Sequence, residues 1–172
     1  MRKVRYCVAM SLDGYIAGPN GEADWIVMDP DIDFAALFRQ FDTFLLGRKT
    51  FAWMLQNGAV SSSAETKTYV FSKTLQQSDY PAVTVIAEGA EAVVQELRAQ
   101  PGKDIWLFGG GELFRSLLAQ RCVDRIEVAI IPVLLGQGIP FLPAPSQLAR
   151  LQLSAHKIYP QSGIVALEYE VQ

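Results

Sequence analysis

Three consecutive glycines, Gly109 to Gly111, separate two apolar segments of different periodicity. The segment before them, Ile105–Phe108, is a continuous apolar run typical of a buried parallel strand. The segment after them, from Glu112 onward, repeats its apolar residues with the spacing of an amphipathic helix. A strand, a glycine turn and a helix in this order predict an α/β fold built on a largely parallel sheet.

The same junction is a candidate anion site. The first turn of a helix has unpaired N–H groups and a partial positive charge, and glycine lets a phosphate reach the main chain. In the alternative, the glycines only supply the backbone angles of a tight turn. Glu112 either competes with a bound phosphate or turns back to cap the helix.

A second strand–glycine–helix junction lies earlier in the chain. The apolar run Thr43–Leu46 is followed by Gly47, Arg48, Lys49 and Thr50, and then by a helical segment. Cations are unfavourable at a helix start unless an anion is present, and arginine offers a planar fork suited to phosphate. The junction therefore favours a second phosphate site over a pair of solvated cations.

The rest of the chain extends this α/β pattern. A helix is expected to start at Asp31 or Asp33, with an apolar stripe of Phe34, Leu37, Phe38 and Phe41. Two final strands, 151–159 and 164–171, form a hairpin, so the sheet is expected to have a parallel core and an antiparallel edge. The last strand is expected to bury one face, formed by Val165, Leu167, Tyr169 and Val171.

Composition and missing motifs exclude several classes. The 172 residues have a net charge of −3, which gives no electrostatic case for nucleic acid or anionic membranes. His156 is the only histidine, which argues against a histidine metal site and Ser-His-Asp catalysis. The first residues lack the continuous apolar core of a signal peptide and no apolar run reaches membrane-spanning length, so neither is expected, and Cys7 and Cys122 are expected to be buried thiols. We expect one cytoplasmic domain over residues 1–172.

The motifs that are present and absent also limit which nucleotide the chain is expected to bind. The sequence contains neither G-x-G-x-x-G nor G-x-x-x-x-G-K-[ST], and the acidic run from Asp29 fails the calcium-loop pattern at Phe34 and Gln40. Two separate phosphate sites, one with an arginine, suit NADPH, which has a pyrophosphate and a 2′-phosphate.

Four segments together resemble the dihydrofolate-reductase-like superfamily, and more closely the reductase domain of bacterial riboflavin biosynthesis and its stand-alone relatives. They are MSLDGYIAGPNGEADW, LLGRKTF, FGGGELFRSLL and IEVAIIPVLLGQGIPFL. The resemblance implies a three-layer α/β fold with a mostly parallel eight-stranded sheet and an antiparallel C-terminal hairpin. It also implies NADPH binding, a small-molecule substrate and a homodimer.

The resemblance also implies which residues would bind the cofactor and which would face the substrate. The 2′-phosphate end of NADPH would meet Gly47, Arg48, Lys49, Thr50, Ser72 and Lys73. The pyrophosphate would lie on Gly109, Gly110, Gly111, Glu112 and Leu113, and the nicotinamide on the backbone of Ala9 and Ile16. Asp13, Trp25 and Asp33 would face the substrate.

We therefore expect an NADPH-dependent reductase that passes hydride to a small heterocycle or an imine or carbonyl compound, with a pyrimidine-like or pterin-like ring. Asp33 is the first candidate for proton supply, and Asp13, Asp31 or water are alternatives. Two other hypotheses remain: a non-catalytic NADP(H)-binding module, and a protein whose glycines serve packing alone.

Overall fold

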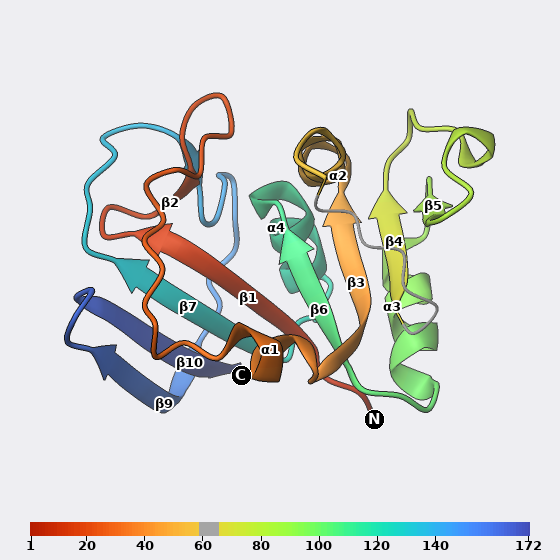
Figure 1. The fold of residues 1–172 in the computed structure, drawn as a ribbon. Coiled ribbons are helices and arrows are strands. Elements are labelled where there is room, and N and C mark those ends of the chain that lie inside the picture. Colours follow the sequence, from red (N-terminus) through yellow and green to blue (C-terminus); the bar gives the residue numbers. More distant parts are fainter. Residues whose placement is uncertain (59–65) are drawn as a thin grey trace.

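One eight-stranded sheet organises the molecule, in the order β5-β4-β3-β6-β1-β7-β10-β9 (Figure 1). The structure is a computed structural model that describes residues 1–58 and 66–172. Its strands are β1 (Val4–Ser11), β3 (Phe41–Gly47), β4 (Lys67–Phe71), β5 (Thr84–Ile86), β6 (Asp104–Gly109), β7 (Arg125–Ile131), β9 (Leu151–Tyr159) and β10 (Ile164–Val171).

The strand directions confirm the predicted mixed sheet. All neighbouring pairs from β5 to β7 are parallel, whereas β10 runs antiparallel to both β7 and β9. A separate antiparallel pair joins β2 (Tyr15–Ala17) to β8 (Ile139–Pro140). This small pair holds the loop after β1 against the segment after β7.

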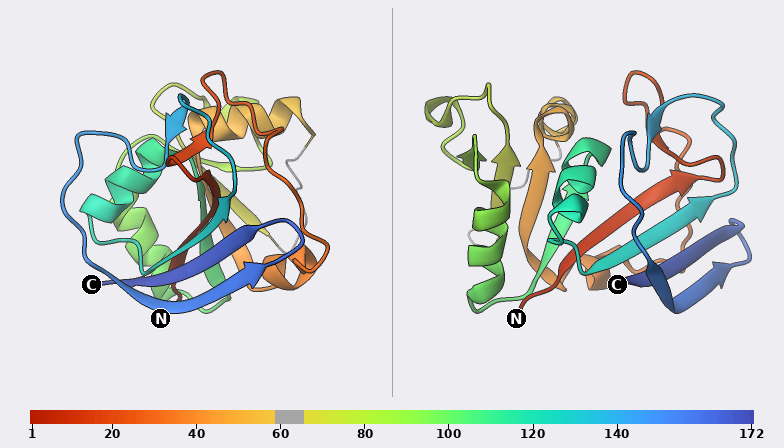
Figure 2. Two further views of the ribbon diagram at one scale, coloured as in Figure 1. Left: turned by 90° about the vertical axis from the view of Figure 1, so that its left-hand side faces the viewer. Right: turned by 180° about the vertical axis from the view of Figure 1, so that it is seen from behind.

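Helices cover both faces of the sheet, as the two views of Figure 2 show. On one face α3 (Ala90–Ala99) and α4 (Gly111–Ala119) pack on β1, β3 and β6. On the other face lie α1 (Phe34–Phe38) and α2 (Arg48–Gln56). A short 3₁₀ turn, Gln77–Asp79, precedes β5. This arrangement is the three-layer α/β fold expected from the sequence.

The main core lies between the sheet and the α3–α4 layer. Tyr6 of β1 stacks on Phe114 of α4, with ring centroids 4.0 Å apart, and both side chains are fully buried. Cys122 also lies in this core, and Cys7 is buried on the opposite face. Both are free thiols, as predicted.

The predicted helix stripe ending at Phe41 was wrong. Helix α1 has only five residues, and Phe41 is the first residue of β3. Its ring lies 4.9 Å from that of Trp106, and Phe38 also packs on Trp106 at 5.0 Å. Phe38 and Phe41 have the spacing of a helix in the sequence because a short helix and the following strand place their rings in the same aromatic cluster.

The predicted one-sided burial of β10 was also wrong. Ile164 is buried, but the rest of the strand is only partly buried on both of its faces. Its outer neighbour β9 is exposed along almost its whole length. An edge strand with little cover shields β10 poorly, so the alternation in its sequence does not produce a fully buried face.

No helix in the described parts of the chain is long and apolar enough to cross a lipid bilayer. The cytoplasmic location stays a prediction.

Candidate functional site

The two glycine junctions lie side by side in the folded chain. Strands β3 and β6 are parallel neighbours, so their carboxyl ends and the helices that follow meet at one edge of the sheet. A Cβ atom on Gly47 would lie 3.4 Å from both the carbonyl oxygen of Gly109 and the nitrogen of Gly110. Glycine at position 47 therefore lets the two helix starts approach each other closely.

A cleft of about 1650 Å³ opens at this edge of the sheet. Typical ligand pockets have roughly 300–1,000 Å³, so this cleft has room for a dinucleotide and a second small molecule. Apart from Gly109, every residue predicted to bind the cofactor lines it: Ala9, Ile16, Gly47, Arg48, Lys49, Thr50, Ser72, Lys73, Gly110, Gly111, Glu112 and Leu113.

The three glycines at the start of α4 occupy their positions for different structural reasons. Gly109 has a φ of 130°, which favours glycine, and a Cβ on Gly111 would lie 2.8 Å from the carbonyl oxygen of Pro140. A Cβ on Gly110 would instead point toward the cleft, 3.4 Å from Thr50 Oγ1. Packing alone accounts for Gly111, whereas Gly110 keeps the approach to the helix start open.

The start of α4 is available to an anion. Gly110 is its N-cap residue, and no side chain caps the first turn. The Glu112 carboxylate does not turn back onto the helix start but accepts a 2.6 Å hydrogen bond from Arg115 Nη2, one turn further along. This ion pair directs the negative charge of Glu112 away from the free N–H groups.

The start of α2 combines free N–H groups with unpaired cations. Gly47 is its N-cap residue, and no side chain caps this helix either. Arg48 and Lys49 are exposed, and neither side chain has a hydrogen-bond or ion-pair partner within residues 1–58 and 66–172. Two unpaired cations at a positive helix end are costly by themselves, which favours an anion between them.

Ser72 and Lys73 extend this polar end of the cleft. Ser72 follows β4 and is 8% exposed, and its hydroxyl accepts hydrogen bonds from the backbone N–H groups of Thr74 and Leu75. The hydroxyl therefore fixes the turn after β4. This turn places the exposed Lys73 beside the cleft.

Asp13 does not line the cleft. Its carboxylate accepts hydrogen bonds from the backbone N–H groups of Leu135 and Gly136 and from the Ser11 hydroxyl, which lies 2.6 Å away. The Ser11 hydroxyl, followed by the N–H groups of Gly136 and Leu135, lowers the pKa of Asp13. Asp13 thus joins the loop after β1 to the loop before β8.

We expect Asp13→Asn to reduce the acid sensitivity of the fold. The pKa of Asp13 is lower in the folded state, so its stabilising effect is present above its unfolded pKa of about 4 and is lost as the pH falls through the folded value. The melting temperature of the wild type should therefore fall more steeply below about pH 4 than that of the variant. Asp24→Asn, which changes an exposed carboxylate, is the control. An equal acid response of Asp13→Asn and wild type would contradict this role.

The other predicted substrate residues also lie outside the cleft lining. Asp33 is the N-cap of α1, with Oδ1 accepting a 2.8 Å hydrogen bond from the N–H of Ala36, and its side chain is 67% exposed. Asp31 does not cap this helix. Trp25 donates its indole N–H to the carbonyl of Glu22. The geometry brings neither Asp13, Trp25 nor Asp33 to the cleft, whereas their neighbours Ile26 and Phe34 do line it.

Sequence reasoning missed the aromatic part of the cleft. Phe38, Trp53, Trp106 and Phe108 line it, together with Phe34 and Cys7. In the sequence these residues look like core positions, and only the fold shows that they line the cleft, with Phe38 and Trp53 exposed and Trp106 and Cys7 buried. Burial raises the pKa of the Cys7 thiol, and the nearby Glu127 carboxylate adds to the shift.

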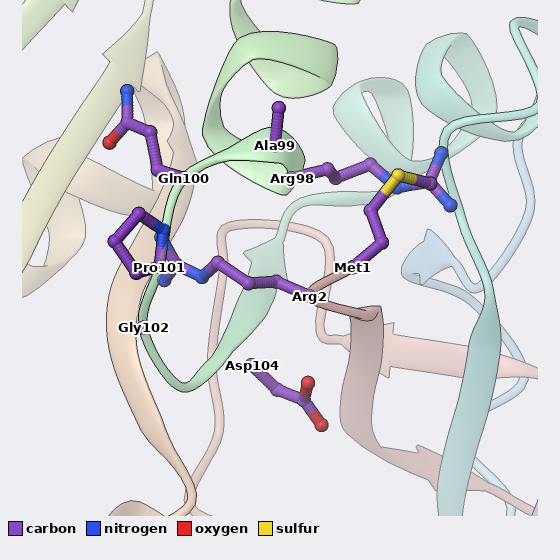
Figure 3. Close-up of a pocket in the computed structure, with 8 residues that line it drawn as sticks. All are labelled: Met1, Arg2, Arg98, Ala99, Gln100, Pro101, Gly102 and Asp104. Atoms are coloured by element: carbon purple, nitrogen blue, oxygen red, sulfur yellow. The ribbon is translucent and has the colours of Figure 1, made fainter.

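A second hollow, of about 670 Å³, lies where the chain starts and α3 ends (Figure 3). Arg2 reaches along it with a side chain that is 5% exposed. Its guanidinium donates to the carbonyls of Leu97 and Lys103, to Asp42 and to Thr43. Arg98 pairs with Asp124 at 2.5 Å. Since Arg2 and Arg98 already form ion pairs within the fold, we assign the functional site to the larger cleft.

In the described chain no cluster of His, Cys, Asp or Glu is arranged to hold a metal ion.

Comparison with known proteins decides the family. The family model of the RibD C-terminal domain matches residues 2–165. The chain belongs to the RibD C-terminal domain family. The chain is 35% identical to the uncharacterized protein YyaP of Bacillus subtilis (strain 168), over 98% of this chain and 94% of that protein.

Solved structures confirm the fold of this chain. A putative riboflavin biosynthesis protein from Shewanella sp. PV-4 has a TM-score of 0.83 and 22% identity, with 100% of this chain and 99% of that chain covered. Dihydrofolate reductase from Enterococcus faecalis, in complex with NADP(H), has a TM-score of 0.67 and 18% identity, with 98% and 94% covered. The chain therefore has the dihydrofolate-reductase-like fold.

Proposed function

We propose that this protein is an NADPH-dependent reductase of a small heterocyclic, imine or carbonyl compound. The observation that carries the proposal is the pair of uncapped helix starts at one cleft, with Arg48 and Lys49 beside them and without a partner among the residues that the structure describes. A dinucleotide with two separate phosphate centres matches two such positions. The Enterococcus faecalis dihydrofolate reductase, which has this fold, is in complex with NADP(H).

Each part of the cleft has a role in this proposal. The N–H groups at the start of α4 bind the pyrophosphate, and Arg48 with Lys49 binds the 2′-phosphate. The backbone of Ala9 and Ile16 orients the nicotinamide. Bound NADPH supplies the hydride, and the protein positions the ring and the substrate and limits the access of water.

Water is our proposed source of the proton. Asp13 is held by the loop before β8, and Asp33 caps α1, so neither carboxylate reaches the cleft. Among the described residues, the charged residues that line the cleft are Arg48, Lys49, Lys73, Glu88 and Glu112, and all follow β3, β4, β5 or β6.

Titration with NADPH tests the proposal. Trp53 and Trp106 line the cleft, so bound NADPH should quench tryptophan emission, and it should raise the melting temperature because it binds only the folded state. Glycines that serve packing alone predict neither effect. Oxidation of NADPH with a panel of pterins, pyrimidinones and quinones then separates an enzyme from a non-catalytic binding module, which would bind NADPH and reduce none of them.

We also propose a homodimer, based on the edge of the sheet. Strand β9 is one of the two edge strands of the sheet, and its apolar side chains Leu151, Leu153 and Ile158 are 42%, 50% and 60% exposed. An exposed edge with apolar side chains is a surface that proteins usually cover. Light scattering over a series of concentrations should give twice the mass of one chain, and a constant monomer mass would contradict the dimer.

A further inference from the structure

The loop between β2 and α1, residues 18–33, forms one side of the cleft, and we call it the wall loop. It continues from Ile16 and Ala17 of β2, passes the turn between β9 and β10, and ends at the start of α1 (Figure 2). The wall-loop residues that line the cleft are Pro19, Asn20, Gly21, Ala23 and Ile26. The position of this loop therefore affects the shape of the cleft.

Most hydrogen bonds of the wall loop stay inside it or lead to α1. The backbone N–H of Gly18 donates to the carbonyl of Glu22, and that of Ile26 donates to the carbonyl of Ala23. The side-chain amide of Asn20 also donates to the Glu22 carboxylate. Local hydrogen bonds of this kind hold the shape of the loop, but they do not fix where the loop lies against the sheet.

Within the described residues, Asp29 alone hydrogen-bonds the wall loop to a segment other than α1. Its Oδ2 accepts a 3.2 Å hydrogen bond from the backbone N–H of Ser162, in the turn between β9 and β10. Its Oδ1 accepts a 2.9 Å hydrogen bond from the N–H of Asp31. The Ser162 hydroxyl, followed by the N–H of Asp31, lowers the pKa of Asp29.

The burial of Asp29 contrasts with its surroundings. Asp29 is 3% exposed, although its neighbours Met28 and Pro30 are exposed. Aspartate is almost never this buried unless it is paired or hydrogen-bonded. The carboxylate thus points inward, against the β9–β10 turn, while the chain on either side of it faces the solvent.

We propose that Asp29 is a positioning residue, which fixes the wall loop against the β9–β10 turn and thereby shapes the part of the cleft that receives the nicotinamide. Asp29 lies between two residues that line the cleft, Ile26 in the wall loop and Phe34 at the start of α1. A wall that is already in place has less conformational freedom to lose when a ligand binds against it. The inference rests on the proposed reductase function and adds to it a residue outside the cleft lining.

Two ligands of different length test this role. NADPH would reach from the predicted phosphate positions to Ala9 and Ile16, whereas adenosine 2′,5′-bisphosphate is only the adenosine end of NADPH and has no nicotinamide. We expect Asp29→Ala to weaken NADPH binding by about tenfold, because the released loop must be ordered again when the nicotinamide binds. The affinity for adenosine 2′,5′-bisphosphate should stay within about twofold of the wild type. Calorimetry with the full chain measures both affinities.

Two further variants make the test specific. Asp29→Asn keeps an oxygen acceptor but loses the charge, so it should show a smaller loss of NADPH affinity than Asp29→Ala. Asp24→Ala is the matched control, because it removes an exposed carboxylate from the same loop and outside the cleft lining, and it should change neither affinity.

Hydrogen exchange, followed by mass spectrometry, tests the structural part of the proposal. In Asp29→Ala, exchange should become faster in the peptides that cover residues 18–33 and the turn at Ser162, while α3 and α4 keep the exchange of the wild type. Unchanged exchange in the wall loop would show that Asp29 does not hold it.

The outcomes separate this role from the proposed function. No loss of NADPH affinity in Asp29→Ala, or an equal loss for both ligands, would overturn the positioning role while NADPH binding by the wild type stands. If Asp29→Ala does not fold, the same comparison is made with Asp29→Asn. A wild-type chain that does not bind NADPH would overturn both proposals. If NADPH binds with the expected pattern but no compound is reduced, the reductase proposal fails and the positioning role stands.

Discussion

Replacing Arg48 with alanine is expected to weaken NADPH binding by about 10- to 150-fold, the effect of losing about 1.5–3 kcal/mol for a hydrogen bond to a charged group. Arg48 lies at the start of α2, lines the cleft and has no ion-pair partner among the described residues. A free guanidinium at a helix start is suited to the 2′-phosphate, which NADH lacks. The affinity for NADH should therefore change little.

Two further variants make this test specific. Arg48→Lys keeps the charge but loses the planar fork, so we expect it to recover only part of the NADPH affinity. Arg150→Ala removes an exposed arginine outside the cleft and should leave both affinities unchanged. An equal loss of NADPH and NADH affinity in Arg48→Ala would show that Arg48 does not recognise the 2′-phosphate.

Replacing Gly138 with alanine is expected to destabilise the fold by about 3 kcal/mol, through backbone strain and overpacking together. Gly138 has a φ of 150°, and a Cβ there would overlap the carbonyl oxygen of Ala17, at the end of β2. The overlapping atom belongs to the backbone, so it cannot move aside as a flexible side chain would. We expect the overlap to push β2 away from β8. Urea denaturation followed by circular dichroism measures the resulting loss in the free energy of unfolding.

Gly136 is the matched control for this prediction. It lies two residues earlier in the same loop, with a φ of 73°, and a Cβ there would meet nothing within 4 Å. Gly136→Ala should therefore cost only about 1–2 kcal/mol for the left-handed backbone. If both variants lose the same stability, the close approach between Gly138 and β2 has no energetic role. Since Gly138 also lines the cleft, Gly138→Ala should weaken ligand binding as well.

The predicted phosphate positions were identifiable from sequence because each depends on a few consecutive residues. A strand, a glycine and a helix in succession define a helix start with free N–H groups, wherever the rest of the chain lies. The structure places the Gly47 and Gly110 junctions at neighbouring strand ends and leaves both helices without a side-chain cap. NADPH binding at these positions stays a prediction.

The predicted substrate residues depend on contacts that the sequence does not show. The resemblance implied Asp13 and Asp33 as substrate residues, and in the structure each has local hydrogen-bond partners and lies outside the cleft lining. Phe38 and Trp106 line the cleft although they were not predicted as site residues. Their positions in the sequence are typical of core residues, and only the fold shows that Phe38 is 46% exposed and that the buried Trp106 lies beside it.

By itself, the sequence determined the α/β class, the order of strands and helices, the antiparallel hairpin at the end and the two glycine junctions, because turn chemistry and apolar periodicity are local properties. Only the tertiary structure decided that the junctions meet at one cleft, that Gly138 must approach β2, and that aromatic side chains from several elements line this cleft. These features depend on which strands become neighbours and on how side chains from distant segments share space. Contacts of that kind are set by packing across the whole sheet, which no single stretch of the chain encodes.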